Sequence, residues 1–272
     1  MSDILLIPIV ELIVVGALAG VVGVLAVLNR QVFFAEAITH ATFPGAVIGV
    51  VIAAALGLSH EGISMLLFLG ALLMCIPLGA LFSLARVGTS ASAAGIVLTL
   101  GFALGYFLNK WYAPLPVKVD SFLVGSVMNA NWTDVAISSA LLAVVLLVLV
   151  ARWRHLTFFA FDRAAYGVAH AAGPTQALIS TLIVLTLVAL IPAMGTILSI
   201  ALLVAPAAAL SAVVRDTRML FLLAPALGVA IGLVGLTIAV WADLSVGGSI
   251  GVCAGVVYAV VKIASRRKET RV

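Results

Sequence analysis

The chain has 272 residues, of which 65% are hydrophobic and only 9% are charged, and its formal net charge is +4. With a mean hydropathy of +1.34, this composition excludes a soluble globular domain. Several apolar runs reach the roughly 20 residues that a helix needs to cross a bilayer, and a helix satisfies its own backbone hydrogen bonds in lipid. We therefore predict an all-α polytopic membrane protein. Nucleic-acid binding is excluded, because no soluble domain is left to carry a basic face.

In chain order, the apolar runs predict nine spans within one transmembrane domain that covers residues 1–272. Residues 191–195 leave eight spans as the alternative, because Ile-Pro-Ala-Met-Gly is either a tight outer turn or a break within one irregular segment. Cys75 and Cys253 lie within spans and match no zinc spacing, so we interpret them as packing residues. The predicted spans are residues 7–28, 35–57, 63–84, 93–110, 134–152, 176–192, 195–213, 219–240 and 247–263.

Lysine and arginine are divided between the two sides of this topology. If the C-terminus is cytoplasmic, 12 of the 14 lie in inside connections or adjoining helix ends, including the basic tail 264–272. The outside then holds only Lys110 and Lys118. Cytoplasmic connections carry an excess of Lys and Arg. We therefore predict an odd number of spans, with the N-terminus outside and the C-terminus inside.

Two connections are longer than the rest. The outer one, residues 111–133, is too apolar for a free loop, so we predict a short re-entrant or interfacial helix with Asp120 near its start. The inner one holds a segment at 155–175 in which Asp162 is a typical N-cap and Gly173-Pro174 a typical stop. A short cytoplasmic helix there is either a docking element for a soluble partner or an ordinary amphipathic connector.

A carboxylate and an imidazole stand four residues apart in the second span, at Glu36 and His40. A carboxylate in hydrocarbon costs roughly 2.5–3.5 kcal/mol on insertion scales, and residues at i and i+4 share one face of a helix. The pair is therefore either half of a metal site or a structural polar pair. Pro44, followed by Gly45, removes the helical partner of the His40 carbonyl, which predicts a helix bend at the pair.

Nucleotide-binding motifs are missing from the sequence. Residues 88–95 contain glycines but no lysine, so they are not a P-loop, and no hydrolase or zinc-protease motif appears. We therefore predict that the chain is not an enzyme. If ATP drives its activity, the ATPase is another chain.

Four segments together resemble bacterial ABC importer permeases for manganese, zinc and iron. Residues 35–45, Ala-Glu-Ala-Ile-Thr-His-Ala-Thr-Phe-Pro-Gly, resemble that family's Asp-Ala-x-Ser-His-x-x-x-Pro-Gly signature. Residues 122–126 resemble its Phe-Leu-Phe-Gly segment, and residues 161–162 the start of its ATPase-coupling loop. Residues 194–207 resemble its Val-Gly-x-x-Leu-x-x-Ala-Leu-Leu-x-x-Pro-Ala stretch.

The resemblance implies a homodimer with the type II importer fold in the bacterial cytoplasmic membrane. It also implies two cytoplasmic ABC ATPase subunits and an extracytoplasmic metal-binding protein as partners. The family's metal-coordinating Asp and His correspond to Glu36 and His40, where Glu replaces the usual Asp and extends the arm by a methylene. The family's closing glycine of the coupling loop has two imperfect counterparts. The residues expected to contact the ATPase are Asp162, Arg163, Tyr166, Gly167, His170 and Gly173.

We thus expect the permease subunit of an ATP-driven importer for a divalent transition metal, with manganese first, then zinc, then iron. Metal is the cargo in this interpretation, and no permanently bound cofactor is expected. Two alternatives remain: a proton-driven secondary metal transporter, and an intramembrane metalloenzyme, which would need a third ligand and a general base.

Overall fold

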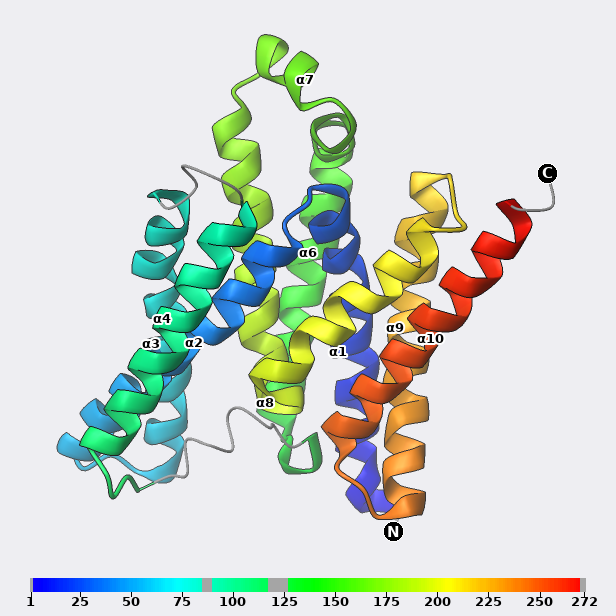
Figure 1. Cartoon of the computed structure of the whole chain (residues 1–272). Helices are drawn as coiled ribbons and strands as arrows, with labels where there is room; N and C mark the ends of the chain where they lie inside the picture. The colour runs from blue at the N-terminus through cyan, green and yellow to red at the C-terminus, as the bar shows by residue number, and fades with distance from the viewer. Residues whose placement is uncertain (1, 85–89, 117–126, 270–272) are drawn as a thin grey trace.

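The computed structural model describes residues 2–84, 90–116 and 127–269. Within these residues the regular elements are all helical (Figure 1). They are α1 (Ser2–Leu28), α2 (Val32–Ala55), α3 (His60–Leu84), α4 (Ser90–Trp111), the 3-10 turn η2 (Val127–Asn129), α6 (Trp132–Phe161), α7 (Arg163–Ala169), α8 (Ala172–Ser211), α9 (Thr217–Ala242) and α10 (Val246–Glu269).

Nine helical stretches among the described residues are long and apolar enough to cross a membrane, which confirms the predicted number. Two of them, Ala172–Ile191 and Met194–Ser211, belong to α8. Gly195 separates them with φ 76° and ψ 167°, a conformation that glycine adopts without steric cost. In Figure 1 the first half of α8 runs away from α7 and the second half runs back. Residues 191–195 therefore separate two antiparallel spans.

The two termini lie at opposite ends of the molecule (Figure 1), as an odd number of spans requires. The α1–α2 and α8–α9 connections lie at the same end as α7. Most described basic side chains lie in these connections or in the neighbouring parts of helices, whereas Lys110 lies at the far end of α4. Those near the α7 end are Arg30, Arg152, Arg154, Arg163, Arg215, Arg218 and Lys262.

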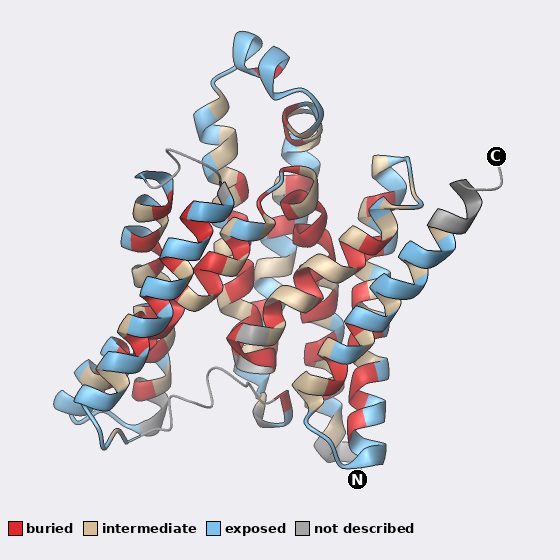
Figure 2. Cartoon of the chain, in the orientation of Figure 1, coloured by how far each residue is buried: buried red, intermediate tan, exposed pale blue. Residues whose placement is uncertain are grey.

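Buried residues gather where α1, α2 and α8 meet in the middle of the molecule (Figure 2). Glycines of α1 allow α8 and α9 to approach this helix closely. A Cβ on Gly16 would lie 2.9 Å from the Val229 backbone on α9, and one on Gly23 would lie 1.9 Å from the Leu203 carbonyl oxygen on α8. Small residues allow transmembrane helices to approach closely.

Two predicted boundaries differ from the structure. The span predicted at 134–152 is longer, because α6 continues to Phe161 with one non-helical residue, Arg152, at φ −114° and ψ 15°. The stop predicted at Gly173-Pro174 is wrong: α7 ends at Ala169, and this dipeptide lies in the first turn of α8. Proline is favoured in the first turn of a helix because the N–H groups there have no intrahelical partner.

Residues 117–126 of the outer segment 111–133, which include Asp120 and the segment 122–126, lie outside the described residues. Its described part ends in η2 and in a capping box at the start of α6. Asn131 accepts hydrogen bonds from the N–H groups of Thr133 and Asp134, and Asp134 accepts one from the Asn131 N–H at 3.0 Å. This reciprocal cap fixes where α6 begins.

Candidate functional site

Glu36 and His40 lie one turn apart near the start of α2, and both side chains are half-buried. The helix begins at Val32 and continues through Pro44 without a residue of non-helical backbone. The backbone is thus helical at Pro44 and Gly45, and the bend of the helix axis expected there stays a prediction. The spacing keeps the carboxylate and the imidazole on one face, where Phe33 is also 50% exposed.

The His40 ring packs edge-on against Phe102 of α4, with 6.0 Å between the ring centroids. Its Nδ1 is buried and has no hydrogen-bond partner among the described residues. A buried nitrogen without a partner is costly, and it is also a ligand atom that no other group of the described chain occupies. Within a single chain, no hydrogen bond from the described residues offsets the cost of burying this His40 nitrogen.

The His40 carbonyl is the group that Pro44 leaves without a helical N–H. Gly101 of α4 lies against it, because a Cβ at position 101 would come within 3.0 Å of the His40 oxygen and 3.1 Å of the Ala41 Cα. Gly105, one turn further along α4, lies in the same way against the Phe43 ring. Sequence reasoning missed these glycines, although their four-residue spacing is the signal for close helix packing.

The hydroxyl groups nearest to the pair along α2 are used within the helix. Thr39 donates to the Glu36 carbonyl oxygen and Thr42 donates to the Thr39 carbonyl oxygen, both at 2.6 Å. Both threonines are fully buried. Because their hydrogens go to backbone carbonyls, they are not donors to the Glu36 carboxylate, whose oxygens keep their capacity to accept or to bind a cation.

A crossing with α3 holds the middle of α2 in place. A Cβ on Gly45 would lie 2.2 Å from the Gly70 carbonyl oxygen, and a Cβ on Gly70 would lie 2.3 Å from the Gly45 oxygen. Gly49 makes a similar approach to the Leu66 carbonyl. Gly45 is thus a close-packing position five residues beyond His40.

The described part of the chain contains no group of three or more His, Cys, Asp or Glu side chains that could hold a metal ion. Glu36 and His40 therefore supply at most two protein ligands from one chain. Transition-metal sites in proteins usually have four or more ligands. The pair is half of a site at most, unless water or a second chain completes it.

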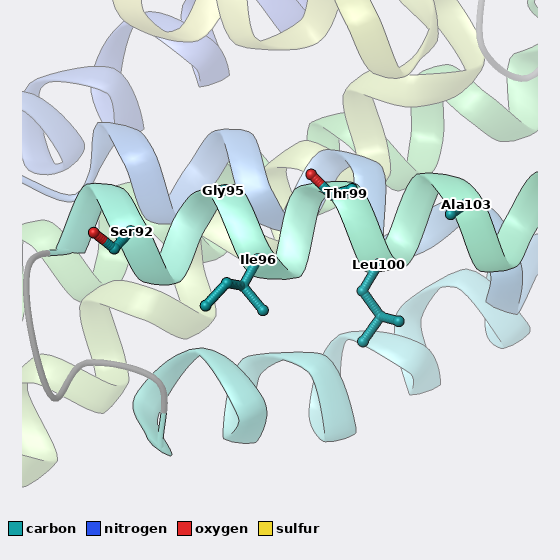
Figure 3. A pocket seen from close by; sticks show the side chains of 6 residues that line it. All are labelled: Ser92, Gly95, Ile96, Thr99, Leu100 and Ala103. Atoms are coloured by element: carbon teal, nitrogen blue, oxygen red, sulfur yellow. The ribbon is translucent and has the colours of Figure 1, made fainter.

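A surface depression of about 620 Å³ lies along α4, away from the pair. Figure 3 shows Ile96 and Leu100 pointing from α4 toward the neighbouring helix, and Ser92 and Thr99 supplying hydroxyls. Its lining contains neither a carboxylate nor an imidazole. This depression therefore has the chemistry of a packing or lipid surface and lacks the ligands of a metal site.

The segment predicted to contact an ATPase forms α7, at the tip of a hairpin made by the ends of α6 and α8 (Figure 1). Asp162 caps α7 as predicted, because its Oδ1 accepts a hydrogen bond from the Ala165 N–H at 2.8 Å. Tyr166 is buried, whereas Gly167, His170 and Gly173 are exposed. Of the expected contact residues, Tyr166 is thus the one that faces inward.

Arg163 connects α7 to the turn that precedes α2. Its guanidinium donates a hydrogen bond to the Asn29 carbonyl oxygen at 2.5 Å and lies over the Phe159 ring at 4.9 Å. On the same turn, the Gln31 side chain accepts a hydrogen bond from Ser180 of α8 at 3.2 Å. Asn29 and Gln31 are both buried. The sequence gives no signal for these contacts, because the partners lie more than a hundred residues apart.

A second acidic side chain, Glu11, lies within the span formed by α1. Its side chain is buried, with 1% exposure. Ser138 of α6 donates to its Oε1 at 2.9 Å, whereas Oε2 has no hydrogen-bond partner. The hydrogen bond pairs this carboxylate with a hydroxyl of a neighbouring span. It ties α1 to α6 far from Glu36 and His40 along the chain.

Across its described residues, the chain has nine helical stretches that can span a membrane, buried polar groups within several of them, and a helical hairpin that protrudes at one end (Figure 1). The chain belongs to the ABC 3 transport family, whose model matches residues 1–265. It is therefore a multi-pass permease subunit of a family of metal ABC transporters, as the resemblance predicts.

Related proteins support this assignment. The chain is 29% identical to the manganese transport system membrane protein MntC of Halalkalibacterium halodurans, over 91% of this chain and 82% of the relative. It is 31% identical to the zinc transport system membrane protein TroC of Treponema pallidum, over 81% of this chain and 74% of the relative. Among solved structures, PsaBC from Streptococcus pneumoniae in complex with Fab matches with a TM-score of 0.81 and 25% identity, over 95% of this chain and 90% of that chain.

Proposed function

We propose that two copies of this chain form the membrane channel of an ATP-driven importer for a divalent transition metal ion. Glu36 and His40 of each copy face one another across a two-fold axis and bind the cargo on its way through. Manganese is the favoured cargo, followed by zinc and iron. A separate pair of ABC ATPase subunits supplies the energy, and an extracytoplasmic metal-binding protein delivers the ion.

The observation that carries this proposal is the incomplete pair. One chain supplies a carboxylate, an imidazole with an unpartnered buried Nδ1, and a helix face on which Phe33 is 50% exposed. A homodimer with a two-fold axis brings the same patch of both copies together. Such an arrangement doubles the ligands to two carboxylates and two imidazoles, and it also covers exposed apolar side chains.

The ligand chemistry favours this cargo class. Oxygen and imidazole ligands suit Mn²⁺, Zn²⁺ and Fe²⁺, and the set contains no thiolate to select a soft metal. Four protein ligands completed by water also bind less tightly than a closed cage, and a transport site must release what it binds. The two carboxylates make the site more favourable for Mn²⁺ than a site built from imidazoles alone.

Coupling to the ATPase is proposed to run through α7. Movement of this helix reaches α2 through Arg163, which holds the Asn29 carbonyl two residues before the N-cap of α2 at Gln31. Asp162, Tyr166, Gly167, His170 and Gly173 are the other residues proposed to contact or shape the ATPase interface. The excess of basic side chains at the α7 end supports a cytoplasmic position for α7 and for the C-terminus, with the N-terminus outside.

The proposal is tested by uptake of radioactive Mn²⁺ into vesicles that contain the permease, the ATPase and the binding protein. We expect Glu36→Gln and His40→Ala to reduce uptake by at least tenfold, because the first removes both negative charges from the four ligands of the dimer and the second removes both imidazoles. Ile48→Ala, a substitution at an exposed position of the same helix, is the matched control and should retain uptake. Thermal unfolding of each purified variant checks that the helix bundle is intact.

Two outcomes would contradict the proposal. Normal uptake in both Glu36→Gln and His40→Ala would remove the pair from the transport path. Uptake by the purified permease without the ATPase, driven by a proton gradient, would instead support a secondary transporter. Binding of Mn²⁺, Zn²⁺ and Fe²⁺ to the wild-type permease and to the His40→Ala variant then orders the three metals by affinity at this site.

A further inference from the structure

Two histidines meet where α6, α7 and α8 come together, at the α7 end of the molecule. His155 lies in the last third of α6, and His170 is the C-cap of α7. Their ring centroids are 5.0 Å apart, with the planes inclined at 59°. The His155 side chain is half-buried, whereas His170 is exposed. Neither ring belongs to the transport pair, and no role proposed above requires the two rings to be close together.

We propose that His155 and His170 form a second divalent-metal site, on the side of the membrane where α7 lies. The ion would be a first-row transition metal, with Zn²⁺ and Co²⁺ bound more tightly than Mn²⁺, because imidazole ligands follow the Irving–Williams order. Two protein nitrogens bind the ion and water fills the remaining positions.

The distance between the rings fits one metal ion. A nitrogen bound at 2.0–2.1 Å places its ring centroid about 3.2 Å from the metal, and two such rings at a tetrahedral angle have centroids about 5.2 Å apart. The observed separation is 5.0 Å. The planes are inclined at 59°, so the two rings do not stack face to face.

Tyr166 prepares His155 for this role. Its hydroxyl lies 3.3 Å from His155 Nδ1 and 2.8 Å from Thr175 Oγ1. If the hydroxyl donates to Thr175, it accepts from the Nδ1–H of His155, and the Nε2 lone pair is then available for a metal. Metal-binding histidines commonly donate their other ring N–H to such a partner, which fixes the tautomer and the ring orientation.

Tyr166 also packs against both rings, with centroids 6.2 Å from His155 and 5.0 Å from His170. Because it is only 2% exposed, it is a fixed wall of the site. Arg154 and Arg163 are nearby in sequence, and their positive charges oppose a cation. We therefore expect weaker binding than at a closed structural zinc site, which suits a site that fills only when metal is abundant.

A metal ion bound by both residues would tie α7 to α6. Because α7 is the proposed contact with the ATPase, an occupied site would restrict its movement and slow ATP hydrolysis when metal accumulates on that side. This consequence rests on the proposed function, whereas metal binding by the two histidines does not.

Binding is measured on the permease alone, in the Glu36→Ala/His40→Ala background so that the transport pair cannot contribute. Titration with Co²⁺, followed by the visible absorption of the bound ion, should show one site per chain with nitrogen ligands. The additional substitution His170→Ala should remove that site, and Tyr166→Phe should weaken it while leaving the stoichiometry unchanged. His170 is exposed, so its loss should not unfold the protein.

Thermal unfolding supplies an independent measurement, because an ion that binds only the folded state raises the unfolding temperature. Zn²⁺ should stabilise the background protein and leave the His170→Ala protein unchanged. Equal Co²⁺ spectra and equal Zn²⁺ stabilisation in the two proteins would overturn the site. In the full complex, Zn²⁺ added on the ATPase side should slow ATP hydrolysis at least threefold with wild-type permease but not with His155→Ala, which leaves the proposed ATPase-contact residues intact. Equal inhibition would overturn the regulatory role alone.

Discussion

Replacing Gly45 by alanine tests whether the crossing of α2 and α3 positions Glu36 and His40. The new Cβ would lie 2.2 Å from the Gly70 carbonyl oxygen and 2.5 Å from the Met74 Cβ. Ordinary contact begins at 3.4 Å, so the two helices must separate by about 1.2 Å. Neither obstacle is the end of a flexible side chain, and the strain therefore cannot be relieved by a rotamer change.

The expected cost follows from this separation. Overpacking of a dense interior typically costs about 1–3 kcal/mol, and a radial gap of roughly 0.5–1 Å already forfeits a quarter to a half of the dispersion energy of the contacts around it. A chain of this size loses about 2–4 °C in unfolding temperature for each kcal/mol. We therefore expect Gly45→Ala to lower the unfolding temperature by roughly 5 °C. Metal uptake should fall too, because His40 lies five residues away on the displaced helix.

Labelling of Cys75 can measure the thermal unfolding of this helix crossing. This cysteine is 6% exposed on α3, one turn beyond Gly70, and its thiol lies 3.3 Å from the Ala71 carbonyl oxygen. In a Cys253→Ser background, a thiol-reactive fluorophore reports the separation of α2 from α3 during heating. Gly255→Ala is the matched control, because a Cβ at that position has no atom within 4 Å. Equal unfolding temperatures for Gly45→Ala and Gly255→Ala would refute the reasoning.

Two further predictions concern polar contacts between helices. Ser138→Ala removes the donor to the buried Glu11 carboxylate and should lower the free energy of unfolding by about 0.6–2 kcal/mol. Glu11→Leu combined with Ser138→Ala should cost less than the sum of the two single changes. Additive costs in thermal unfolding would contradict this coupling. Arg163→Ala should reduce metal uptake per ATP hydrolysed at least threefold, since it disconnects α7 from the Asn29 carbonyl, with Arg163→Lys intermediate. An unchanged ratio of uptake to hydrolysis in reconstituted vesicles would show that Arg163 is only a structural residue.

The membrane spans could be predicted because their signal is local. Each span is a continuous apolar run, and the basic side chains mark the ends at one side, so composition alone gives the number and alternation of the helices. The N-cap at Asp162 was also predictable, because its partner is three residues away at Ala165. The stop at Gly173-Pro174 was wrong for a related reason: proline and glycine mark a helix boundary without saying whether a helix ends or begins there.

Contacts between helices could not be predicted in the same way. Gly101 against the His40 carbonyl and Arg163 on the Asn29 carbonyl depend on which spans are neighbours, and an apolar run does not encode its neighbours. The meeting of His155 with His170 is similar, because it requires α7 to fold back on α6. Residue types alone led to Glu36 and His40 as candidate metal ligands, since ionisable groups within spans are rare and expensive, and their role in metal binding stays a prediction.

The position of the pair near the start of α2 has a mechanical consequence. At a rise of about 1.5 Å per residue, Glu36 and His40 lie roughly 8 and 14 Å along α2 from its N-cap at Gln31. Beyond the pair, Gly45 holds α2 against the Gly70 backbone, while Asn29 and Gln31 are held by Arg163 and Ser180 at the other end. A helix held on both sides of Glu36 and His40 moves the two side chains together when it shifts. Movement of α7 must therefore shift the carboxylate and the imidazole together, which favours opening of the proposed metal site by displacement of a whole helix over rotation of single side chains.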